Sequence, residues 1–196
     1  MSEQVTYISE IMAQPQEFFW LPWAVQYFFF IGIAACATLY AGYLHWQGKS
    51  ENSRLEMIAV FITITMGITA PLALTADLHQ TARVWHFYAH PTIWSWMWWG
   101  SVLLPLFTTF SGLYFVALLV KLIWKKEFKA TRWVALLSAL SAVGLLLYTG
   151  REASVLIARP IWFSWWIPVL LFFSAMQAGP ALISLGARRE PQYQQR

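Results

Sequence analysis

Five long runs of apolar residues, separated by short polar connections, dominate the chain. A helix needs roughly 20 apolar residues to cross the hydrocarbon core of a membrane, which is about 30 Å thick. Runs of about this length with few charges occupy residues 21–46, 55–75, 96–122, 133–149 and 162–185. The pattern predicts an all-α integral membrane protein, a helical bundle of about five transmembrane helices that forms a single domain over residues 1–196.

Prolines and one glycine are expected to shape these spans. Pro22 lies near the first turn of its span, where the missing N–H costs nothing, whereas Pro168 and Pro180 are expected to bend the last span. Gly150 follows the fourth run, and glycine is common just past the C-terminus of a helix. We therefore expect a short fourth span that ends at Gly150.

Lysine and arginine are unevenly distributed among the connections. The first connection, the third connection and the C-terminal tail together contain ten. The N-terminal segment, the second connection and the fourth connection contain three, which are Arg83, Arg151 and Arg159. Because cytoplasmic connections carry the excess of basic residues, we expect the N-terminus to lie outside and the basic tail 187–196 to be cytoplasmic. This predicts a multi-pass protein of a bacterial inner membrane.

The composition supports a membrane environment and excludes several other functions. Hydrophobic residues make up 59% of the chain and charged residues 11%, whereas about a quarter of a soluble domain is charged. The net charge of +4 comes from residues in short connections, so we expect membrane lipids and no nucleic acid as partners. The single cysteine, Cys36, cannot hold an iron–sulfur cluster alone. Residues 1–16 lack the basic start of a signal peptide, so no removable leader is expected.

The four histidines do not fit a haem site. Membrane cytochromes hold haem between imidazoles on facing helices at matching depth, but His45 lies at the predicted cytoplasmic end of the first span, and the other three lie in the second connection. We expect no haem and no metal in this chain. No nucleophile elbow, Walker loop or zinc-binding helix motif is present either. The chain is therefore not expected to be catalytic alone.

Ionisable residues gather at the predicted outer ends of the spans. Such groups near membrane depth are costly and indicate functional sites by default. Two connections on the same predicted face contribute Asp77, Arg83, Arg151, Glu152 and Arg159. These five side chains can form one mutually neutralising cluster. The alternative is that they are ordinary interfacial residues, with the arginines anchoring helix ends among the lipid headgroups.

Several short sequence motifs lie around these residues. They are Asp77 after the second span, Arg83-Val-Trp85-His86, His90-Pro91, the tryptophan-rich start of the third span, Tyr148-Thr-Gly and Ala158-Arg-Pro-Ile-Trp162. Together these motifs resemble the NrfD/PsrC family of quinone-reactive membrane subunits, and the resemblance extends from Phe18 to about Gly179. Family members usually carry eight or more helices, so the resemblance also implies that this chain is truncated.

The resemblance implies a quinol-oxidising membrane anchor within a respiratory oxidoreductase. In such complexes electrons pass from menaquinol or ubiquinol to a periplasmic iron–sulfur subunit, and then to a molybdopterin catalytic subunit. The family's quinone pocket lies within the first four helices. A polar residue of the first span and a tyrosine at the end of the fourth contact the headgroup. Gln26 stands where a relative has a histidine, and Tyr148 stands at the tyrosine.

Oxidation of a quinol releases two protons, so the site needs titratable groups near water. Asp77 is the expected proton acceptor, tuned by partial burial and by nearby arginines, with His79 and His86 as alternatives. The residues expected around the quinone are Gln26, Tyr148, Arg83, Arg151, Glu152 and Arg159.

Each assignment has a plainer alternative. Asp77 is equally well a salt-bridge partner, Tyr148 an interface anchor, and Gln26 a hydrogen-bonding contact between helices. The whole chain is alternatively a passive anchor without a quinol site, or a small transporter. The transporter is disfavoured, because the span interiors show no Lys, Arg, Asp or Glu and no internal repeat is evident.

Overall fold

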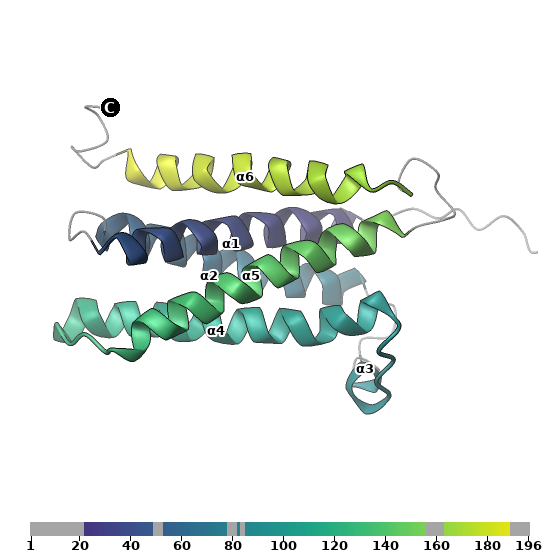
Figure 1. Ribbon diagram of the computed structural model, residues 1–196, viewed down its shortest axis with the longest axis horizontal. Helices are drawn as coiled ribbons and strands as arrows, with labels where there is room; N and C mark the ends of the chain where they lie inside the picture. The colour runs from purple at the N-terminus through teal and green to yellow at the C-terminus, as the bar shows by residue number, and fades with distance from the viewer. Residues whose placement is uncertain (1–21, 49–52, 78–81, 83–84, 156–162, 189–196) are drawn as a thin grey trace, which may run out of the picture.

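A computed structural model describes residues 22–48, 53–77, 82, 85–155 and 163–188 (Figure 1). These residues contain the helices α1 (Pro22–Gln47), α2 (Ser53–Asp77), α3 (His86–Ala89), α4 (Trp96–Trp124), α5 (Ala130–Ser154) and α6 (Trp166–Ala187). All of them except the short α3 are long and apolar enough to cross a membrane. The predicted all-α membrane bundle of about five spans is therefore confirmed.

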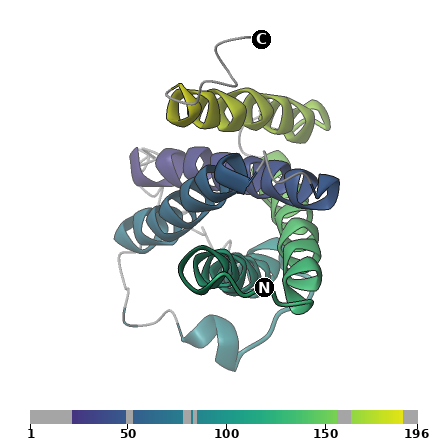
Figure 2. The ribbon, with the colours of Figure 1, turned by 90° about the vertical axis from the view of Figure 1, so that its left-hand side faces the viewer.

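Four of the long helices form a bundle, and α6 packs on its outside (Figure 2). Helix α1 contacts α2 and α5, and α4 contacts the same two helices, so the four close into a ring. Helix α6 lies mainly against α1 and also touches α5 (Figure 1). The ring consists of the first four spans of the chain.

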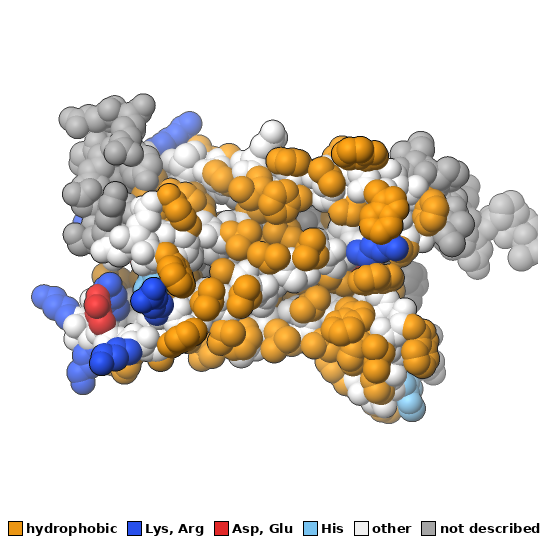
Figure 3. Space-filling model, in the orientation of Figure 1, with side chains coloured by type: hydrophobic (Ala, Val, Ile, Leu, Met, Phe, Trp, Pro, Cys, Tyr) orange, Lys and Arg blue, Asp and Glu red, His pale blue; other side chains and the backbone are white. Residues whose placement is uncertain are grey.

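The two ends of the bundle differ in charge. Helices α1, α4 and α6 end where α2 and α5 begin, and the connection between α4 and α5 carries Lys125, Lys126 and Lys129 there. We call this the lysine-rich end. In Figure 3 the lysine-rich end is on the left, where most of the visible basic side chains gather, and hydrophobic side chains are spread over the middle of the molecule. The end that carries α3 is called the opposite end, and its assignment to the outside of the membrane stays a prediction.

Small residues let α1 pack closely at the centre of the molecule. Helices in lipid gain little from the hydrophobic effect between them, so close approach and interhelical hydrogen bonds hold them together. Four alanines of α1 have no exposed surface: Ala34, Ala35, Ala37 and Ala41. The Thr38 hydroxyl also donates to the Thr63 hydroxyl of α2 over 3.1 Å. The centre of α1 is thus fixed by shape and by polar contacts.

Helix α5 continues past Gly150 to Ser154, so the span does not end where the sequence predicted. The glycine serves the packing of α6 instead. A Cβ atom at position 150 would lie 2.9 Å from the Cα and 2.8 Å from the Cβ of Pro168. Pro168 belongs to the first turn of α6, where its missing N–H breaks no helical hydrogen bond. The two residues form a close contact between α5 and α6.

Gly150→Ala is expected to destabilise the protein, because the added methyl group meets the backbone of Pro168, which cannot rotate away. Overpacking of this kind costs about 1–3 kcal/mol. Gly112→Ala in α4 is the matched control, since a Cβ there meets nothing within 4 Å. Thermal unfolding in detergent, followed by helical circular dichroism, measures both variants. Equal stability of the two variants would contradict the close α5–α6 contact.

Candidate functional site

Tyr148 lies inside the four-helix bundle near the opposite end. It belongs to α5, and only 6% of its surface is exposed. Its ring packs against Gly100 of α4 so closely that a Cβ atom at position 100 would overlap the phenol. Because glycine has no side chain, the backbone of α4 forms one wall for the tyrosine. The phenol is therefore held in a defined place between two helices.

Glu152 lies one helical turn beyond Tyr148, on the same face of α5. The Tyr148 phenol and the Glu152 carboxylate are close enough to interact electrostatically. Glu152 is partly exposed, whereas Tyr148 is buried, so the carboxylate is the more exposed member of the pair. A hydrogen-bond donor thus lies beside a partly exposed proton acceptor.

Tyr27 completes this group from α1. It is 3% exposed and lies in the same buried cluster as Tyr148. Its hydroxyl interacts electrostatically with both Glu152 and Tyr148. We call Tyr27, Tyr148 and Glu152 the phenol–carboxylate group. It brings together polar atoms of α1 and α5 beside the glycine of α4.

Arg151 points to aromatic rings. Its guanidinium lies 4.5 Å from the ring centre of Trp165 and 5.5 Å from that of Trp96. Trp96 begins α4, and Trp165 directly precedes α6. These cation–π contacts tie the end of α5 to the starts of two other helices.

The remaining predicted site residues are placed as follows. Gln26 is exposed on α1, next to the buried Tyr27. His86 is exposed on α3, which packs on α4 and extends away from the bundle (Figure 1). Asp77 is the last residue of α2. Its side chain lies outside the described part of the chain, and so do three further predicted residues: His79, Arg83 and Arg159.

A second polar cluster, absent from the sequence-based predictions, lies at the lysine-rich end. Glu56 of α2 is 6% exposed and accepts a hydrogen bond of 2.6 Å from the Tyr114 hydroxyl of α4. Its same oxygen lies 2.7 Å from Nδ1 of His45 in α1. This buried carboxylate lies in the first turn of its span, at the end of the apolar run. Its signal was the pairing of an acid in the first turn of one span with a histidine in the last turn of the preceding span.

Among the described residues, no three His, Cys, Asp or Glu side chains lie close enough together to hold a metal ion. The phenol–carboxylate group can donate hydrogen bonds and accept protons. A buried phenol donor beside a partly exposed carboxylate suits a substrate that gains or loses protons as it reacts.

Comparison with known proteins identifies the family of the chain. Residues 10–192 match the family described as polysulphide reductase, NrfD. The C subunit of the tetrathionate reductase of Salmonella typhimurium strain LT2 is 62% identical over 183 residues, which cover 93% of this chain and 54% of the relative. The chain thus spans about half the length of that protein. The sequence of stretches 73–86 and 148–152 predicts a resemblance to this relative, and the overall identity confirms that resemblance for the chain as a whole. Since the match covers nearly the whole chain, this protein is a member of the NrfD family of membrane proteins.

Proposed function

We propose that this chain is the quinol-oxidising membrane subunit of a respiratory oxidoreductase. The phenol–carboxylate group carries the proposal, because it supplies a donor and an acceptor within the four-helix bundle. The similarity to the C subunit of a tetrathionate reductase supports the same function and favours tetrathionate as the terminal acceptor. The quinol is menaquinol or ubiquinol.

The proposed reaction converts the quinol to a quinone, two protons and two electrons. The Tyr148 hydroxyl donates a hydrogen bond to one quinol oxygen and orients the ring. Glu152 accepts the proton from that oxygen and releases it to water at the opposite end, where the carboxylate is partly exposed. Asp77, His79 and His86 are the candidates for the second proton. Arg83, Arg151, Arg159 and Gln26 remain candidates for contact with the headgroup.

The electrons leave through partner subunits. We propose that a periplasmic iron–sulfur subunit docks at the opposite end and passes both electrons to a molybdopterin subunit. Reduction of tetrathionate to two thiosulfate ions consumes two electrons, which equals the yield of one quinol. This arrangement requires the opposite end to face the periplasm and the lysine-rich end to face the cytoplasm of an inner membrane, as the distribution of basic residues predicts.

Tyr148→Phe is expected to lower the rate of quinol oxidation about tenfold, because one hydrogen bond to the headgroup is lost while the ring stays packed. The measurement is menaquinol-analogue oxidation by membranes that contain the chain with its partner subunits. Tyr43→Phe is the control, since Tyr43 is 60% exposed at the other end of α1. If the chain is a passive anchor without a quinol site, both variants should leave the quinol-oxidation rate of the complex at its native value. Solute transport without partner subunits would instead support the transporter.

A further inference from the structure

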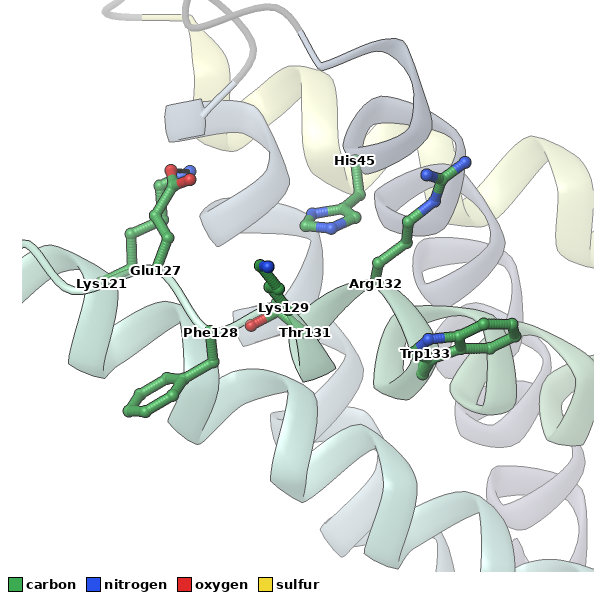
Figure 4. Close-up of a pocket in the computed structure, with 8 residues that line it drawn as sticks. All are labelled: His45, Lys121, Glu127, Phe128, Lys129, Thr131, Arg132 and Trp133. Atoms are coloured by element: carbon green, nitrogen blue, oxygen red, sulfur yellow. Dashed lines mark ion pairs between the residues drawn. The ribbon is translucent and has the colours of Figure 1, made fainter.

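A cavity of about 390 Å³ opens at the lysine-rich end, between the end of α1, the end of α4 and the start of α5 (Figure 4). Its lining includes Lys121, Lys129 and Arg132, with a single carboxylate, Glu127. These residues belong to neither the phenol–carboxylate group nor any step of the proposed quinol reaction. Their chemistry therefore requires a separate explanation.

The cations in this cavity are not balanced by the carboxylate. Lys121 Nζ lies 2.6 Å from Oε1 of Glu127, and this hydrogen bond holds the pKa of Glu127 below its ordinary value. The pair is thus neutral as a whole. Within the described part of the chain, Lys129 and Arg132 form no ion pair. Among the residues that the structure describes, the cavity lining therefore has two positive charges without an ion-pair partner.

Arg132 is held in position by an aromatic ring. Its guanidinium carbon lies 4.5 Å from the centre of the Trp46 ring in α1. The cation–π contact uses one face of the guanidinium and leaves its edge N–H groups available as donors. Figure 4 shows Lys129 and Arg132 among the residues that line the cavity, together with His45. An anion that enters between them would meet donors from two side chains.

The surroundings of the cavity identify the kind of anion. Helix α4 ends at Trp124 and α5 begins at Ala130, so the cavity lies at the depth where the spans reach the lipid headgroups. Two apolar rings in its lining face outwards, Phe128 with 52% and Trp133 with 67% of their surfaces exposed. Exposed aromatic rings at this depth contact the boundary between headgroups and acyl chains. A ligand with both a phosphate and acyl chains satisfies both parts of the site.

We propose that this cavity binds the phosphate of an anionic phospholipid, with Lys129 and Arg132 as its ligands and the outward rings beside its acyl chains. Basic pockets between membrane helices bind anionic headgroups by this combination of charge and position. The site is independent of quinol oxidation, and its test requires no partner subunit.

Native mass spectrometry of the full chain in detergent, supplemented with phosphatidylglycerol or phosphatidylcholine, measures retained lipid. The native chain is expected to retain phosphatidylglycerol in preference to phosphatidylcholine. The double variant Lys129→Gln/Arg132→Gln is expected to weaken phosphatidylglycerol binding roughly 30-fold. The matched control is Lys125→Gln/Lys126→Gln, which removes the same charge from the same connection outside the cavity and should change retention little.

Loss of Arg132 can also loosen the α1–α5 contact, so the single variant Lys129→Gln is tested as well. It is expected to weaken phosphatidylglycerol binding about fivefold. Three results would overturn the proposal. One is equal loss in the cavity and control variants, which would indicate diffuse attraction to the basic surface. Another is equal retention of both lipids by the native chain. The third is displacement of the lipid by millimolar inorganic phosphate, which would identify a free-anion site.

Discussion

Replacing Glu152 with glutamine is expected to lower quinol oxidation about 100-fold, the lower part of the range for loss of a general acid–base group. The amide keeps the size and polarity of the side chain beside Tyr148, but it cannot take a proton. Glu152→Asp keeps the carboxylate and should retain more activity than Glu152→Gln. The measurement is the rate of quinol-analogue oxidation by the complete complex in membranes, normalised to the amount of inserted protein.

The control for this variant is a substitution that removes the same negative charge at another place in the chain. Glu190→Gln serves this purpose, because Glu190 belongs to the basic tail that the sequence predicts on the cytoplasmic side. That variant should oxidise quinol at the native rate. A native rate in Glu152→Gln would show that the proton leaves by another group, and Asp77→Asn would then be the next variant.

Replacing Glu56 with leucine is expected to cost about 3 kcal/mol of unfolding free energy. The Glu56 carboxylate accepts a hydrogen bond of 2.6 Å from the Tyr114 hydroxyl and lies 2.7 Å from His45 Nδ1. Leucine at this position leaves both polar groups without their partner. Removal of one member of a buried polar pair is costly because the other member stays desolvated. Denaturation in mixed detergent micelles, followed by circular dichroism, measures the change.

Two further variants separate the network from simple packing. Glu56→Gln keeps an oxygen acceptor in the same place and should cost less than Glu56→Leu. Tyr114→Phe removes one hydrogen bond and should cost about 1 kcal/mol. The double variant Glu56→Leu/Tyr114→Phe should lose less than the sum of the single losses, because both changes remove the same contact. Strict additivity would mean that the two residues stabilise the bundle independently.

The number and type of the spans follow from the sequence alone, because membrane spans have a length requirement that any long apolar run displays. The boundary at Gly150 does not follow, because a glycine signals equally a helix end and a close contact between helices. Only the position of Pro168, 18 residues later in the chain, decides between them. The end of α5 is thus decided by the packing of segments that are far apart in the sequence.

The candidate site was partly accessible from the sequence. Tyr148 and Glu152 were both named, and their spacing of four places them on one face of a helix once α5 extends beyond Gly150. Tyr27 was missed although it adjoins Gln26, because an apolar run does not reveal which of two neighbouring residues faces inwards. The partnership of Glu56 with His45 was missed because the carboxylate stands at the edge of its run and reads as part of a polar connection.

The contact between Gly100 and Tyr148 also bears on how the sequence can change over evolution. Any residue other than glycine at position 100 places its Cβ within the volume that the phenol occupies. A larger residue at position 100 therefore requires the phenol at position 148 to move or to be replaced by a smaller side chain. We expect relatives with a larger residue at position 100 to differ at position 148 as well.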